Sequence, residues 1–129
     1  MAMHSRISAF LLASVLGLAA IAVQAAELLM IEEDGCIWCA RWNSEIGPIY
    51  PLTLEGKVAP LRRVDIRDAP PPGISLKSPA AFTPTFVLIE NGAEIGRIEG
   101  YPGEDFFWGL LGVLMRQLPR NTVPEVTGL

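Results

Sequence analysis

Histidine is almost absent from this sequence, since His4 is the only histidine among its 129 residues. A Ser-His-Asp triad or a Cys-His pair uses a histidine as its base. Residues 5–129 contain no histidine, so these usual forms of nucleophilic catalysis are excluded there. Cysteine is scarce as well, with two residues. A structural zinc site takes four ligands, usually cysteine or histidine, so one copy of this chain is unable to build one.

Positive charge is also in short supply. The chain has 10 lysine and arginine residues against 14 aspartate and glutamate residues, a net charge of −4. Nucleic acids and anionic membrane surfaces are bound through basic patches or stripes, so we expect neither as a partner. The sequence contains no internal repeat and no low-complexity segment. Its length suits one domain.

The first 25 residues have the pattern of a signal peptide. Arg6 is the only permanent charge before an apolar run at Ile7–Val23, and small residues follow at Val23 and Ala25. This pattern predicts cleavage after Ala25, which leaves one exported domain of 104 residues at 26–129. An uncleaved membrane anchor is the alternative, because about 17 apolar residues are just enough to span a bilayer. In both cases the rest of the chain lies outside the cytoplasm.

Apolar runs separated by turn signals predict a β-α-β unit, a connection, a β-hairpin and a final helix. The strands are expected at 27–32, 60–67, 85–90 and 94–99, the helices at 36–46 and 104–117, and a flexible tail at 120–129. A strand–helix–strand start implies a parallel pair, which the hairpin extends with antiparallel strands. We therefore expect an α/β fold, a small mixed four-stranded sheet with helices on both faces.

Both cysteines fall in one motif, Cys36-Ile37-Trp38-Cys39, at the start of the first predicted helix. The free N–H groups and the dipole of a helix N-terminus stabilise a thiolate on Cys36, and Cys39 follows one turn later, where it can close a disulfide. A purely structural disulfide would stabilise the fold little, since closing so small a loop contributes only about 2 kcal/mol in the chain-entropy model. A zinc site shared between two copies is a third explanation. Export favours redox chemistry.

This motif after the first strand, together with Thr83-Pro84-Thr85 just before the strand at 85–90, resembles the thioredoxin superfamily over essentially all of 26–129. The resemblance implies a thioredoxin fold that needs no cofactor or metal. It also implies a cis bond before Pro84 facing the disulfide, and a backbone at Thr83 that pairs with an incoming peptide. Cis X-Pro bonds are infrequent, so one at this place would be functional.

Apolar side chains beside the cysteines suggest a docking surface. Ile37 and Trp38 lie between them and suit a protein substrate, although Trp38 could instead belong to a buried stripe with Trp42 and Ile46 at four-residue spacing. In the last helix, Phe106–Trp108 are expected to be mostly core. At least one of these three is expected to be exposed, because three consecutive residues do not share one helix face.

The motif departs from thioredoxins proper, which have Gly-Pro where this chain has Ile-Trp. Many thioredoxin-like proteins place a buried carboxylate six residues before the first cysteine, and that position here is Met30. Nearby Glu32, Glu33 and Asp34 are expected to be surface acids. Three acids close to the disulfide would raise the pKa values of the thiols, in opposition to the helix dipole. These residues therefore leave open whether the cysteine pair acts as a reductant or as an oxidant of its partner.

The segment Asp34–Trp42, with Gly47-Pro48-Ile49-Tyr50-Pro51, is similar to the periplasmic thioredoxin-like proteins of bacterial sulfur-oxidation (Sox) operons. This similarity implies a periplasmic thiol–disulfide oxidoreductase that returns a sulfur-carrier protein's cysteine to its thiol form. The implied partners are a protein with a disulfide or a modified cysteine, and a membrane thiol reductant as electron donor. We expect a monomer. A disulfide-donating oxidase and a redox-inert binding module of the same fold remain alternatives.

Overall fold

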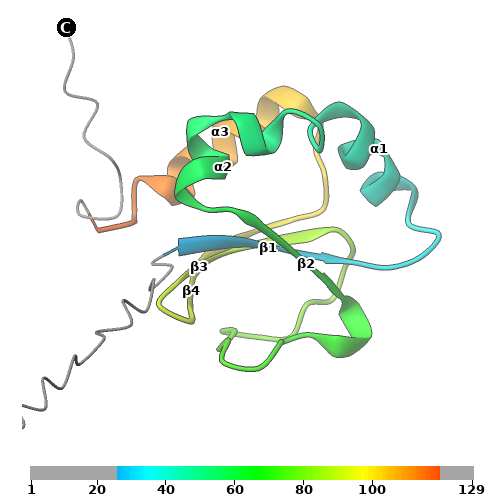
Figure 1. Ribbon diagram of the computed structural model, residues 1–129. Helices are drawn as coiled ribbons and strands as arrows, with labels where there is room; N and C mark the ends of the chain where they lie inside the picture. Colours follow the sequence, from blue (N-terminus) through cyan, green and yellow to red (C-terminus); the bar gives the residue numbers. More distant parts are fainter. Residues whose placement is uncertain (1–25, 120–129) are drawn as a thin grey trace, which may run out of the picture.

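The computed structural model describes residues 26–119, which form one four-stranded sheet and three α-helices (Figure 1). The strands are β1 (Ala26–Glu32), β2 (Leu61–Asp65), β3 (Thr85–Glu90) and β4 (Ala93–Glu99). The helices are α1 (Ile37–Glu45), α2 (Leu54–Val58) and α3 (Glu104–Met115), with 3₁₀ turns at Tyr50–Leu52 and Ile66–Asp68. The sheet order is β2-β1-β3-β4; β1 and β2 are parallel and the other pairs antiparallel. This confirms the expected fold class.

The predicted signal peptide at 1–25 and the predicted tail at 120–129 lie outside the described residues. The boundary between residues 25 and 26 therefore stays a prediction. Within 26–119, no helix is long and apolar enough to cross a membrane.

Local sequence places most element boundaries where they were predicted. Asn91 and Gly92 have φ values of +49° and +81°, the two positive angles that a two-residue hairpin turn requires, and they join β3 to β4. The first helix is the predicted one, with Cys36 and Ile46 as its caps. The second strand ends at Asp65, earlier than predicted, because the Asp65 carboxylate accepts a hydrogen bond from the Arg67 backbone (2.8 Å) and starts a 3₁₀ turn.

One face of the sheet carries all three α-helices and encloses the larger core (Figure 1). Alternate residues of β1 and β3 point to this face and pack with Trp42 of α1. The Trp42 ring centroid lies 5.2 Å from that of Phe86 and 5.7 Å from that of Phe107 in α3. These aromatic contacts hold α1, and with it the cysteine motif, against the sheet.

The three neighbouring aromatics of α3 divide as expected. Phe107 is fully buried, Phe106 is exposed, and Trp108 is half-buried and stacks on Tyr50 with ring centroids 6.1 Å apart. Tyr50 in turn donates a hydrogen bond to the Ala59 carbonyl at 2.7 Å. The segment between α1 and β2 is thereby tied to both α3 and the start of the second strand.

The opposite face of the sheet is covered by the connection 66–80, which includes the 3₁₀ turn Ile66–Asp68 but no α-helix, so the expectation of helices on both faces is wrong. Prolines at 70–72 and 79 interrupt any run of helical hydrogen bonds in this connection. Its apolar side chains still cover the buried residues that β1 and β3 turn to this side. The covering residues are Ile66, Ala69, Ile74, Leu76 and Ala80.

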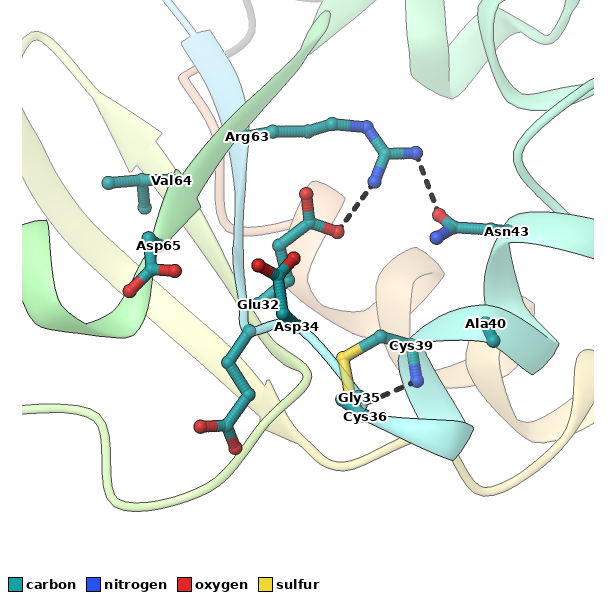
Figure 2. A pocket seen from close by; sticks show the side chains of 11 residues that line it. Glu32, Asp34, Gly35, Cys36, Cys39, Ala40, Asn43, Arg63, Val64 and Asp65 are labelled. Carbon is teal, nitrogen blue, oxygen red and sulfur yellow. Dashed lines mark hydrogen bonds and ion pairs between the residues drawn. A yellow bond between two sulfur atoms is a disulfide. The ribbon is translucent and has the colours of Figure 1, made fainter.

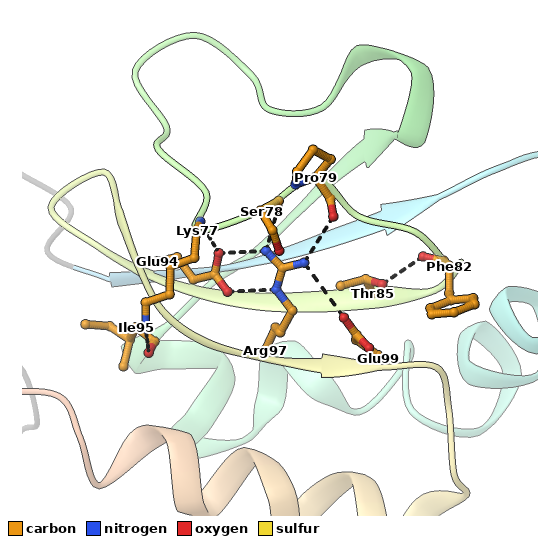
Figure 3. Close-up of polar contacts among 9 residues, drawn as sticks. All are labelled: Lys77, Ser78, Pro79, Phe82, Thr85, Glu94, Ile95, Arg97 and Glu99. Carbon is orange, nitrogen blue, oxygen red and sulfur yellow. Dashed lines mark hydrogen bonds and ion pairs between the residues drawn. The ribbon is translucent and has the colours of Figure 1, made fainter.

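A buried ion pair fastens this connection to β4 (Figure 3). The Glu94 carboxylate accepts hydrogen bonds from the Arg97 guanidinium (2.7 Å) and from the Lys77 backbone N–H (2.7 Å). Arg97 also donates to the Ser78 carbonyl at 2.7 Å. The contacts at Lys77 and Ser78 thus fix the chain a few residues before Pro84.

Candidate active site

The two cysteines lie where a tight turn feeds α1. Gly35 has a φ of +78°, which favours glycine at this point of the turn. Cys36 is the N-cap of α1, and its sulfur accepts a hydrogen bond from the Cys39 backbone N–H at 3.1 Å. The two residues form a disulfide with Cα atoms 5.2 Å apart. Cys36 is partly exposed and Cys39 only 3% exposed, so an external sulfur atom reaches Cys36 more readily.

Three exposed apolar side chains occur in the segments that form this site: Ile37 and Trp38 between the cysteines, and Phe82 just before Thr83 and Pro84. We call them the outer rim. Trp38 is 48% exposed, whereas Trp42 and Ile46 are fully buried, so Trp38 lies outside the buried stripe. Four residues turn a helix by about 400°, so a four-residue spacing drifts by about 40° at each step. Ile37 and Trp38 match the sequence-based expectation of an apolar surface; Phe82 was missed, although an aromatic just before Thr83-Pro84 was a usable signal.

A chain of polar contacts leads from the Trp38 ring through Arg41 and Glu45 to Tyr101. The Arg41 guanidinium lies 5.9 Å from the centre of the Trp38 ring and pairs with Glu45 at 2.9 Å. The Tyr101 hydroxyl donates a hydrogen bond to the same carboxylate. The hydrogen bond from Arg41 lowers the pKa of Glu45, and burial raises the pKa of Tyr101, so the two groups remain acceptor and donor near neutral pH.

The segment before β3 meets the cysteine turn from the other side. The Thr83–Pro84 bond is cis, as the thioredoxin resemblance implies. Thr83 donates a hydrogen bond from its hydroxyl to the Glu33 carboxylate at 2.6 Å, and the Pro84 carbonyl accepts one from Gly100 at 2.7 Å. Glu33 is an exposed acid, as expected, but its carboxylate has a specific task. It ties Thr83 to the turn that precedes Cys36.

A pocket of about 370 Å³ borders the disulfide on its inner side, and Arg63 of β2 crosses it (Figure 2). The Arg63 guanidinium pairs with Glu32 at 2.6 Å and donates to the Asn43 side-chain oxygen at 2.7 Å. It also lies 5.8 Å from the centre of the Trp42 ring. This Glu32–Arg63–Asn43 cluster joins β1, β2 and α1 beside Cys39. Sequence analysis missed Arg63 and Asn43, because their partners lie 31 and 20 residues away.

Met30 is fully buried, so the position where many thioredoxin-like proteins have a carboxylate is apolar here. Met30 and Glu32 are two residues apart on β1 and therefore face the same side of the sheet. The carboxylate on this side is displaced by two residues toward the cysteine turn. Among residues 26–119, no group of three or more histidine, cysteine, aspartate or glutamate side chains could hold a metal ion.

The geometry suits thiol–disulfide exchange: an accessible sulfur at a helix N-terminus, a buried second sulfur, and an apolar rim beside them. Neither a scan against protein-family models nor a search of curated proteins returned a match. Among solved structures, the chain is similar to the periplasmic thioredoxin SoxS from Paracoccus pantotrophus, crystallised in its reduced form. The two are 56% identical with a TM-score of 0.70, over 71% of this chain and 97% of the SoxS chain. The chain therefore belongs to the thioredoxin family that includes SoxS, and it is a thiol–disulfide oxidoreductase.

Proposed function

We propose that the protein is a periplasmic reductase whose Cys36–Cys39 dithiol reduces a disulfide, or a sulfur adduct on a cysteine, of a partner protein. The observation that carries this proposal is the unequal exposure of the two cysteines at the start of α1, which makes Cys36 the attacking residue and Cys39 the resolving one. The similarity to a thioredoxin described as periplasmic supports the location. The resemblance of 34–51 to Sox proteins supports a sulfur-carrier protein as the class of partner.

The cycle begins at Cys36. The helix N-terminus stabilises its thiolate, which attacks a sulfur atom of the partner and forms a mixed disulfide. The displaced sulfur leaves with the bonding electron pair and takes up a proton. Cys39 then attacks the Cys36 sulfur, the bond from Cys36 to the partner breaks, and the partner leaves as a thiol. Two electrons have passed to the partner, and the Cys36–Cys39 disulfide remains.

Docking of the partner falls to the residues around Cys36. Ile37, Trp38 and Phe82 offer apolar surface for the partner's side chains. The backbone at Thr83 and Pro84 would orient the partner's chain, and the contact from Thr83 to Glu33 keeps that backbone close to the turn before Cys36. A membrane thiol reductant would then return two electrons to the disulfide, so that another cycle can begin.

The test is to trap the mixed disulfide in cells. Cys39→Ser removes the attacking sulfur of the second step, so we expect a disulfide-linked partner to accumulate in the periplasm, visible on non-reducing gels. Cys36→Ser is the matched control, and it should trap nothing and abolish turnover. If Cys39→Ser captures no partner, the proposed cycle is wrong.

The direction of the cycle is tested by the reduction potential of the purified protein, titrated against a thiol buffer. A reductase should have a value near about −270 mV, the value of thioredoxin, whereas a disulfide donor should lie near about −120 mV. The second result would replace the reductase by an oxidase that uses the same two cysteines. A disulfide that never titrates would leave a redox-inert binding module.

A further inference from the structure

We propose that Arg63 is a positioning residue for the second half of the cycle: its guanidinium stabilises the thiolate that Cys39 must form. This inference rests on the proposed function, in which Cys39 attacks the mixed disulfide on Cys36. It assigns a role to the Glu32–Arg63–Asn43 cluster, which the docking of a partner on the outer rim does not use.

Cys39 needs such help because its surroundings oppose a negative charge. It is 3% exposed and belongs to an apolar cluster with Met30, Trp42 and Phe86. Burial of this kind disfavours the thiolate and raises a thiol pKa. Cys39 also lies inside the first turn of α1 rather than at its cap, so the N-terminal N–H groups point to Cys36 instead.

The charged groups that face Cys39 come from the cysteine turn, β1 and β2. Of the described residues lining the shared pocket, the acids are Glu32, Glu33, Asp34 and Asp65, and Arg63 is the one cation. Asp65 is engaged by Arg67 at 2.8 Å, and Glu33 by Thr83. The elements α3 and β3 present the apolar rings of Phe107 and Phe86 to this core. Arg63 is therefore the group that can favour a thiolate here.

The guanidinium is held on the Cys39 side of the sheet. Arg63 is the register partner of Met30 in the parallel β1–β2 pair, so its side chain emerges on the face that α1 covers. Asn43 follows Cys39 by four residues and therefore lies on the same side of α1. Glu32 and Asn43 each accept a hydrogen bond from one terminal nitrogen of the Arg63 guanidinium, as Figure 2 shows. The guanidinium is therefore already held in place before the thiolate forms.

The charge acts in one defined step. The Cys39 thiol loses its proton to solvent in the pocket, its sulfur bonds to the Cys36 sulfur, and the Cys36–partner bond breaks. The partner's sulfur leaves with the electron pair and takes up a proton. When an external thiol later attacks Cys36 to reset the enzyme, Cys39 leaves as the same thiolate. Arg63 therefore favours both directions and should act on rate and on the thiol pKa.

Two measurements test this role. In a Cys36→Ser background, Cys39 is the single thiol, and its pKa is read from the ultraviolet absorbance of the thiolate. In the reduced protein, an aromatic disulfide reagent releases one coloured thiol when Cys36 attacks and a second when Cys39 attacks. We expect Arg63→Gln to raise the Cys39 pKa by about one unit and to slow the second release about tenfold at pH 7, with the first release unchanged.

Further variants separate charge from packing. Arg63→Lys keeps the charge and should restore most of the second release. Glu32→Gln removes the opposing charge and should shift the Cys39 pKa downward, opposite to Arg63→Gln; an upward shift would contradict this electrostatic account and overturn the proposal. Arg62→Gln is the matched control, because Arg62 lies on the same strand and pairs with Glu27 of β1 at 3.4 Å, on the other face.

The proposal is wrong if Arg63→Gln leaves the Cys39 pKa unchanged and the rate of the second release within twofold of wild type. It is also wrong if Arg62→Gln changes both quantities equally. Neither measurement involves the biological partner. If Cys39→Ser traps no partner while Arg63→Gln behaves as expected, the proposed function fails and the role of Arg63 stands. If a partner is trapped and Arg63→Gln has no effect, only the present inference fails.

Discussion

Two sets of side chains, each built around a tryptophan of α1, have the same composition but tryptophans of very different burial. Each consists of a tryptophan, an arginine over its ring and a glutamate that pairs with the arginine. They are Trp38, Arg41 and Glu45 on the outer side, and Trp42, Arg63 and Glu32 on the inner side. The arginine carbon lies 5.9 Å from the ring centre in the outer set and 5.8 Å in the inner set. Trp38 is 48% exposed and Trp42 is fully buried.

The difference shows how one pattern supports two tasks. The outer set is local, because Arg41 and Glu45 follow Trp38 by three and seven residues on one helix. It leaves one face of the ring open to a partner. The inner set joins α1, β1 and β2, so it exists only when the sheet and helix have packed. The outer set therefore suits the proposed docking of a partner, and the inner set suits packing and the role proposed for Arg63.

The largest expected effect is the loss of the inner ring. Trp42→Ala should destabilise the protein by about 3–5 kcal/mol, because the Trp42 ring contacts Tyr50, Phe86 and Phe107 and its removal leaves a cavity. The free energy of unfolding is measured by urea denaturation followed by circular dichroism. Trp42→Phe, which fills part of the cavity, should cost clearly less. A loss below about 1 kcal/mol for Trp42→Ala would contradict the assigned core role.

A third arginine–glutamate pair extends the comparison to the opposite face of the sheet. The side chains of Arg97 and Glu94 are 13% and 2% exposed, less than those of the other two pairs. Glu94→Gln should cost about 2 kcal/mol at pH 7, since it weakens charged hydrogen bonds to Arg97 and Lys77. Urea denaturation at pH 7 measures this loss.

The same pair predicts a dependence on pH. The hydrogen bond from Arg97 lowers the pKa of Glu94 below its ordinary 4.5. The stabilisation is therefore complete above the ordinary pKa and is lost as pH falls through the lowered one. The unfolding free energies of wild type and Glu94→Gln should converge as pH is lowered from 6 toward about 3. Parallel curves over that range would show that this carboxylate does not stabilise the fold.

The smallest effect on stability is expected at the outer ring. Trp38→Ala should change the free energy of unfolding by less than about 0.5 kcal/mol, because the ring is half exposed. It should slow the reaction with a protein disulfide about tenfold, as for a contact residue in a docking surface. A small aromatic disulfide serves as control and should react at an unchanged rate. Equal slowing with both reagents would place Trp38 in the chemistry instead of in docking.

Local signals in the sequence were enough for most of the fold. Asn91-Gly92 predicted the hairpin, because only a few residue pairs adopt two positive φ angles easily. The apolar run at 85–90 predicted the strand whose six residues are all buried. The cover of the second face was not predictable in the same way. The connection 66–80 has no helical or strand period, and its contacts with the sheet depend on a chain path that the prolines allow but do not specify.

The cysteine pair was predicted because its chemistry is local. Cys36, Cys39 and the helix N-terminus lie within four residues, so spacing alone places both sulfur atoms together. The surroundings of the pair were not predictable by spacing. Whether Trp38 or Trp42 is buried depends on which side of α1 the sheet takes. The exposed Phe82 was missed although its place just before Thr83 and Pro84 was a usable signal.

The sequence by itself therefore determined the redox motif, the parallel and antiparallel strands, and the turn and helix signals, because these depend on residues close together in the chain. Tertiary structure decided what surrounds the disulfide. It brought Arg63 to Glu32 and Asn43, and Thr83 to Glu33, across 20 to 50 residues of sequence. Such contacts follow from strand register and from the side of the sheet on which a helix packs. These are properties of the assembled layers and not of any single segment.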